Sequence, residues 1–337
     1  MTSTRPTAEA AGTSGPARRP AAGPAVALLV LVALAALIPL FGPRPALDGT
    51  GEASAPGVGG IALLRTVLFA ALCVPAGELF VARLARRAPG APSRAAPRSW
   101  APYAAAAGFV AALGLASVVA TGNLLPHHLS DMDVGGLYGT RDGRLALLEV
   151  NAFAVAGLCA LSRRPAAQVW PLTAIAVAEA LRAHPPAEQH PLIGSGLTLV
   201  HVTCAALWAG GLPHVLRMLR AWGAAEAGAA LLGRYARVAA VLFAAITATG
   251  VGSTLRRMPS GTVLDQLTST SYGRALLAKL LLVAAVAVLT LLARLRLRRS
   301  ADRLGAGVPA RGEVAALGLV VAASGLLTAL PLPIRWS

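Results

Sequence analysis

Four of the six histidines lie in two hydrophilic connections, a placement that points to metal chemistry. His127 and His128 begin a run that also contains Met132, and His184 and His190 bracket a second connection. Imidazole and thioether groups are ligands that suit copper, and a thioether favours Cu(I). We predict that these five residues form a copper-gathering surface. The alternative is that the connections simply carry polar residues.

The most distinctive histidine lies inside a long apolar stretch, over residues 192–216. His201, Cys204 and Trp208 recur there at positions i, i+3 and i+7, so they share one helix face. An ionisable residue at membrane depth indicates a functional site, and a histidine with a cysteine one turn away offers soft ligands for Cu(I). The alternative is a neutral histidine that donates a hydrogen bond to a backbone carbonyl between helices.

The elements that must position these residues are apolar and helical. About nine stretches approach the roughly 20 residues that a helix needs to cross a bilayer. They run over residues 25–41, 58–82, 101–121, 145–161, 168–181, 192–216, 238–255, 275–293 and 313–332. This pattern predicts an all-α fold, a polytopic transmembrane helical bundle of about nine helices in the lipid bilayer.

The arginines between the stretches alternate by side. Most of the 30 lysines and arginines fall in every second connection, including residues 83–98, 217–237 and 294–311. The positive-inside rule therefore predicts an N-in, C-out orientation. The net charge of +16 is then explained by basic loops that face anionic lipid, and no nucleic acid partner is needed.

The short connections leave no room for a soluble domain on either side. We expect a disordered cytoplasmic tail over residues 1–24, N-terminal transmembrane helices over 25–179, a second transmembrane domain over 180–332 and a short outer tail over 333–337. No Gly-rich phosphate loop or Ser-His-Asp arrangement is visible, so the chain is not expected to be an enzyme.

Four motifs in the second half resemble the copper resistance protein D (CopD) family. A histidine followed by Trp-x-Gly-Gly stands in residues 201–212, Arg-Tyr-Ala-x-x-Ala in 234–239, Thr-Gly at 249–250, and Thr-x-Tyr-Gly-Arg-x-Leu-Leu-x-Lys in 270–279. The resemblance implies a multi-pass protein of the bacterial inner membrane that takes up or handles copper. It also implies that His201 is the intramembrane site residue and that His184 is an outer ligand.

The last motif contains Tyr272, Arg274 and Lys279, and the lysine lies inside the helix. Lys279 is expected either to extend towards the outer surface or to pair with an intramembrane acid, for which Glu149 and Glu179 are candidates. A third acid, Glu78, is closer to the inner face and is expected to pair with Arg83 or with loop arginines.

Two alternatives to copper homeostasis come from other classes of protein. A helical bundle with histidines at membrane depth is also the setting of a haem-b electron carrier, although matched histidines on a second helix are not evident. An assembly partner of a respiratory complex would hold no ligand of its own. Under the copper hypothesis, copper is the ion bound, and an extracytoplasmic copper-binding protein is a candidate partner.

Overall fold

The computed structural model describes residues 37–53, 56–91, 96–122, 126, 128–222, 225–258, 261–299 and 307–331. These parts form helices and contain no strand. The helices are α2 (Pro43–Leu47), α3 (Val58–Ala85), α4 (Ala101–Ala120), α5 (Val134–Gly139), α6 (Arg141–Leu161), α7 (Val169–Arg182), α8 (Pro191–Trp222), α9 (Ala225–Arg257), α10 (Val263–Ser269), α11 (Ser271–Arg299) and α12 (Gly307–Ala329). The all-α prediction is confirmed.

Six of the described helices are long and apolar enough to cross a membrane, namely α3, α4, α6, α8, α9 and α11. The fold is therefore that of a multi-pass membrane protein. Within α12, residues Val314–Ala329 form a shorter apolar segment. The predicted stretch 168–181 is the 14-residue α7, which is about 21 Å long and so shorter than a bilayer core of about 30 Å. The stretch 25–41 lies mostly outside the described residues, as do both predicted tails, so the count of nine stays a prediction.

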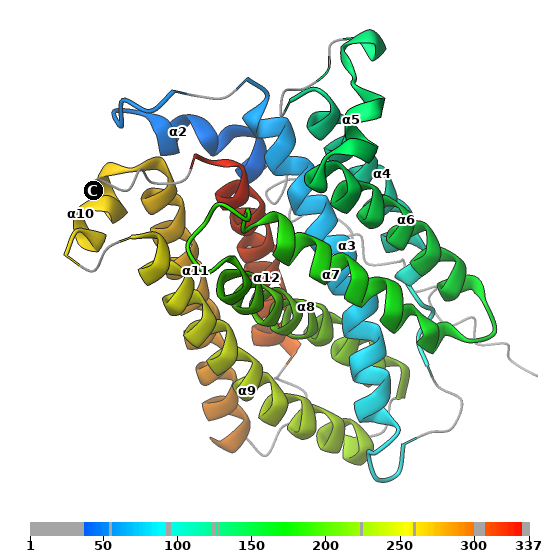
Figure 1. The fold of residues 1–337 in the computed structure, drawn as a ribbon. Coiled ribbons are helices and arrows are strands. Elements are labelled where there is room, and N and C mark those ends of the chain that lie inside the picture. Colours follow the sequence, from blue (N-terminus) through cyan, green and yellow to red (C-terminus); the bar gives the residue numbers. More distant parts are fainter. Residues whose placement is uncertain are drawn as a thin grey trace, which may run out of the picture.

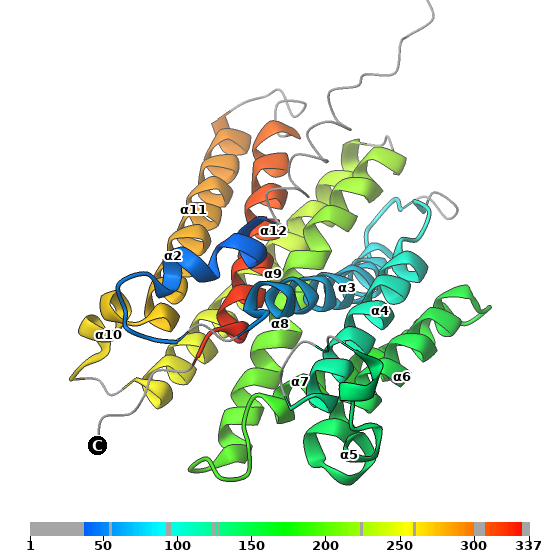
Figure 2. The same ribbon diagram turned by 90° about the horizontal axis from the view of Figure 1, so that it is seen from above.

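Helix α3 lies at the centre of the bundle and contacts α4 on one side and α8 and α12 on the other (Figures 1 and 2). One apolar core joins α3 to α4, α6 and α7, with Leu68, Phe153 and Ile175 fully or almost fully buried. A second core joins α3 to α8 and α9. The chain thus forms two groups of helices that share α3.

The contact between α3 and α8 depends on two glycines. A Cβ atom on Gly210 would overlap the carbonyl of Cys73, and a Cβ on Gly77 would overlap the backbone of Gly210. The two helices therefore meet backbone to backbone. Close approach of this kind is a common basis of helix association in membranes, where burial of apolar surface no longer drives it.

Polar contacts join connections that the arginine pattern predicts to be on the same side of the membrane. At the start of α8, Arg256 donates to the carbonyl of Gln189 at 2.7 Å, which joins two connections predicted to be outside. Near the other end of α8, Arg217 donates to Glu78 at 2.9 Å, beside the α3–α4 connection that is predicted to be inside. The predicted sides therefore correspond to opposite ends of the bundle, while the absolute orientation stays a prediction.

Cysteine labelling of intact cells checks that orientation. In a version of the chain whose three native cysteines are replaced, single cysteines within residues 122–143 and 256–273 should react with a membrane-impermeant reagent added outside. Cysteines within residues 84–99, 217–237 and 294–311 should react only after the membrane is opened, because basic connections stay on the cytoplasmic side. Labelling of the 122–143 connection from the cytoplasm alone would contradict the N-in orientation.

Candidate intramembrane metal site

His201 lies on α8, ten residues from the start of the helix at Pro191, which is about 15 Å along its axis. Its side chain is half-buried. Helix α9 packs closely against α8 and presents Thr249 to the imidazole ring. A histidine and a threonine from neighbouring helices therefore meet well inside the apolar part of the bundle.

The hydrogen bonds of Thr249 favour one of the two neutral forms of His201. The hydroxyl Oγ1 donates its single hydrogen within α9, where the carbonyl of Ala245 lies 2.7 Å away. The same oxygen lies 3.0 Å from His201 Nδ1, and it acts there as an acceptor when its hydrogen is donated within α9. The proton of a neutral imidazole is then on Nδ1, and the lone pair is on Nε2. In metal sites of proteins, a group that does not touch the metal commonly orients the histidine through such a hydrogen bond.

Cys204 and Trp208 share the face of His201 but have different surroundings. Cys204 is a free, half-buried thiol one turn after His201, so it stays a candidate second ligand. Trp208 is buried, and its ring packs edge-on against Phe243 with 5.4 Å between centroids. Its carbonyl accepts a hydrogen bond from Tyr235 at 2.8 Å. Trp208 therefore belongs to the packing of α8 against α9.

Lys279 comes from α11, and its positive charge acts on the His201 ring. Its side chain is half-buried. Thr249 therefore contacts the histidine directly, whereas Lys279 acts on it only through its charge.

Comparison with protein families finds a match in the second half of the chain. Residues 229–331 match the family model of copper resistance protein D. The resemblance recognised from the motifs is confirmed for this segment, which runs from α9 into α12 and includes Thr249 and Lys279. No curated protein and no solved structure matches the chain. His201 lies on the helix that precedes the copper resistance D segment, and the bounds 180–332 stay a prediction.

The other motif residues of the copper resistance D segment organise its outer connections. Tyr272 is buried, and its hydroxyl accepts a hydrogen bond from Arg257 at 3.0 Å. Arg274 donates to the carbonyl of Thr268 at 2.8 Å and also to the carbonyl of Asp48. These contacts hold α10 and the connection after α2 against the start of α11.

The two acids considered as partners of Lys279 each pair with an arginine instead. Glu149 accepts from Arg182 at 2.7 Å, and Glu179 accepts from Arg65 at 2.8 Å. The reason is the arrangement of the helices, since α6 and α7 pack on the α4 side of the bundle whereas α11 packs on α12. Hydropathy and charge patterns did not identify either arginine as a partner, because they carry no information about which helices are neighbours.

Glu78, by contrast, has the kind of partner that was expected. It accepts from Arg217 at 2.9 Å and from the backbone N–H of Trp100 at 2.8 Å. Its partner is one of the arginines predicted to be on the inner side, although Arg217 lies in α8 and not in a loop. His214 Nδ1 lies 3.8 Å from the same carboxylate.

Among the histidines predicted to be on the outer side, His184 is held most firmly by its neighbours. Its ring is buried, with Nδ1 2.6 Å from Glu188 and Nε2 2.9 Å from Thr198. Gly194 abuts the ring, and a Cβ there would overlap it. Both nitrogens are therefore engaged, and a metal ion would have to replace one of these partners. His184 anchors the α7–α8 connection to α8.

The remaining outer candidates are more accessible. His128 and His190 are exposed, Met132 is half-buried, and His127 lies outside the described residues. Arg141 at the start of α6 donates to the carbonyl of Leu181 at 2.9 Å, so the end of the first connection lies close to the start of the second. Within the described parts of the chain, no three His, Cys, Asp or Glu side chains gather as a metal-ligand group.

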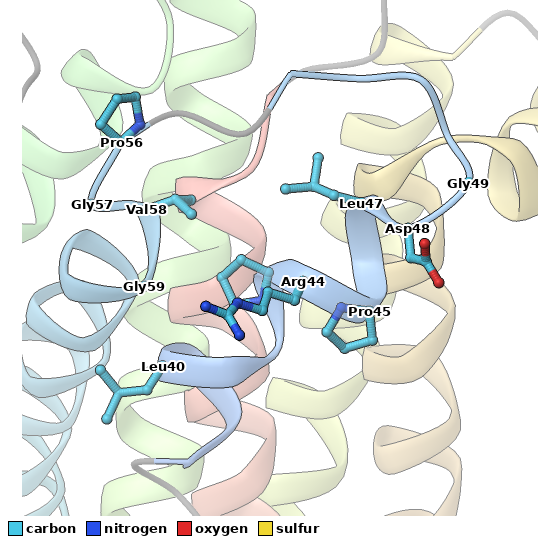
Figure 3. A pocket seen from close by; sticks show the side chains of 11 residues that line it. Leu40, Arg44, Pro45, Leu47, Asp48, Gly49, Pro56, Gly57, Val58 and Gly59 are labelled. Carbon is cyan, nitrogen blue, oxygen red and sulfur yellow. The ribbon is translucent and has the colours of Figure 1, made fainter.

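A hollow of about 750 Å³ lies away from His201, beside α2 and the start of α3 (Figure 3). Proline, glycine and leucine residues line most of it, and Arg44 and Asp48 are its charged residues. None of the candidate metal ligands belongs to its lining. The hollow therefore adds nothing to the candidate site.

Proposed function

We propose that this chain is a copper-homeostasis protein of the bacterial inner membrane, which binds copper at His201 within the membrane and mediates its uptake or transfer. The observation that carries the proposal is the contact of 3.0 Å between His201 Nδ1 and Thr249 Oγ1, because a neutral imidazole held through Nδ1 can bind a metal through Nε2. The match of residues 229–331 to copper resistance protein D supports copper as the ion.

The ligand types support Cu(I) at this depth. Imidazole and thiolate are ligands that copper binds strongly, and Cys204 lies one turn from His201 on the same helix face. No catalytic reaction is assigned to the site. Copper would be the cargo, held while it passes between the outer surface and the interior of the bundle.

We assign the capture of copper to the predicted outer end of the bundle. His128, His190 and Met132 carry imidazole and thioether groups there, and His127 belongs to the same connection. These ligands are dispersed, which suits weak and exchangeable binding. An extracytoplasmic copper-binding protein is the partner that we expect to deliver or accept the ion at this surface.

Metal analysis of the purified protein, combined with its absorption spectrum, tests the proposal. We expect copper to bind in a defined ratio to protein and no Soret band to appear. A Soret band would favour the haem-b electron carrier. Protein that binds neither copper nor haem, and that co-purifies with a respiratory subunit, would favour the assembly partner.

Lys279→Met should strengthen copper retention by about tenfold, because it removes a positive charge that repels a bound cation. Conduction requires sites that release the ion as well as bind it, so transfer should become slower. Competition with a Cu(I) chelator measures the first effect, and release from loaded protein measures the second. Lys279→Arg keeps the charge and serves as the control. Equal retention by both variants would show that the charge does not act on copper.

A further inference from the structure

Four charged side chains meet in the N-terminal half, outside the copper resistance D segment. Glu149 from α6 accepts from Arg182 at 2.7 Å, and Glu179 from α7 accepts from Arg65 of α3 at 2.8 Å. The charges of Glu179, Arg65 and Arg182 all act on Glu149. The four groups therefore form one network with no net charge, which connects three helices of the bundle.

The two carboxylates of this network are held unequally. Both oxygens of Glu179 accept from Arg65 Nη1, at 3.0 and 2.8 Å. Only Oε2 of Glu149 accepts a hydrogen bond, and in the described structure Oε1 is buried without a partner. Glu149 is also the more buried of the two, at 0% exposure. Burying a charged oxygen without a hydrogen bond is costly, so Glu149 is the carboxylate that gains most from losing its charge.

We propose that Glu149 is a proton-binding site, which takes up a proton on Oε1 and releases it reversibly in the folded protein. The step adds one proton from water to Oε1, forms one O–H bond and changes the side chain from −1 to neutral. Arg182 keeps its own protons throughout. Proton uptake removes the ion pair between α6 and α7 and leaves the network with one positive charge.

The other groups near Glu149 are compatible with the single positive charge that the network has after proton uptake. Arg182 lies in the last turn of α7, where the carbonyl ends of the helix favour a cation. The other charged groups of α6 near this end are Arg141, Asp142 and Arg144, in its first turns. Of the remaining elements that pack on α6, α4 and α5 carry one tyrosine each as their ionisable groups, and the turn Pro165–Gln168 carries none.

Infrared spectroscopy of the purified full-length chain, without copper, tests the proposal directly. A protonated carboxylic acid has a C=O stretch that a carboxylate lacks. We expect this band to appear and disappear reversibly between about pH 5 and about pH 9, where an ordinary glutamic acid would already be ionised over most of the range. Glu149→Gln should remove the band. Glu78→Gln should leave it, because that carboxylate is held by several donors at the other end of the bundle.

A second measurement needs no substitution and so does not depend on the stability of a variant. Dicyclohexylcarbodiimide is apolar and reacts with protonated carboxyl groups inside membranes. Peptide mapping should find the adduct on Glu149, at least about tenfold more than on Glu179, and less of it as the pH rises. Absence of a titrating acid band in the unmodified protein, or an adduct on Glu179 with none on Glu149, would overturn the assignment. Because neither measurement involves copper, failure here would leave the proposed function untouched.

Discussion

Replacing His201 with Gln is expected to abolish copper binding within the membrane while the protein still folds and inserts. Glutamine can keep a hydrogen bond to Thr249, but it lacks the nitrogen lone pair that we assign to the metal. Loss of a group that only hydrogen-bonds to a metal ligand typically lowers metal affinity by about 10–100-fold. Loss of the ligand itself should therefore lower it by more than about 100-fold. Titration with Cu(I) against a competing chelator measures the effect.

Substitutions of Thr249 separate a ligand from a structural histidine. Thr249→Val removes the hydroxyl that orients the imidazole, and it should weaken copper binding by about 10–100-fold. Thr249→Ser keeps the hydroxyl and should bind nearly as well as the unchanged protein. If His201→Gln retains full copper binding, the ligand role is wrong and His201 is a structural residue. If the valine and serine variants bind equally, the hydroxyl does not orient the ring.

The second large effect is expected from Gly210→Ala, which should prevent stable packing of α3 against α8. The added Cβ would overlap the carbonyl of Cys73, which is backbone and cannot rotate away as a side chain can. Overpacking costs typically 1–3 kcal/mol, and a backbone obstacle puts the expected destabilisation at about 3 kcal/mol. Because α8 carries His201, the site should be lost with the packing. The apparent unfolding temperature in detergent, together with the amount of protein in the membrane, measures the change.

Gly196→Ala is the matched control on the same helix. A Cβ there meets nothing within 4 Å, so the change adds a methyl group without a clash. Alanine is favoured over glycine in a helix by up to about 1 kcal/mol, so this variant should be as stable as the parent or slightly more stable. Equal stability of the two alanine variants would show that α3 and α8 do not meet through Gly210.

Local patterns in the sequence were sufficient to predict the helices. Eight of the nine predicted stretches coincide with helices of the described chain, and six of these helices are long and apolar enough to span a bilayer. The copper resistance D resemblance was also recognisable, since its motifs are contiguous in the sequence. His201 was identified as the central candidate for the same reason, because a histidine inside a long apolar helix is conspicuous.

The partners of polar groups could not be predicted in this way. Pairings such as Glu149 with Arg182 depend on which helices are neighbours, and hydropathy carries no information about that order. Trp208 likewise looked like part of the site, but its carbonyl and ring belong to the packing of α8 on α9. His184, predicted as an outer ligand, has both ring nitrogens engaged by neighbouring side chains.

The sequence by itself therefore determined the helical elements, their alternation between two ends and the histidine at membrane depth. Only the tertiary structure decided that Thr249 orients His201, that Lys279 acts on the same ring and that Glu149 has an unpartnered oxygen. The physical reason is that helix formation and membrane insertion depend on local composition. Hydrogen bonds and ion pairs depend instead on which helix faces pack together, and that is set by close contacts such as Gly77 against Gly210.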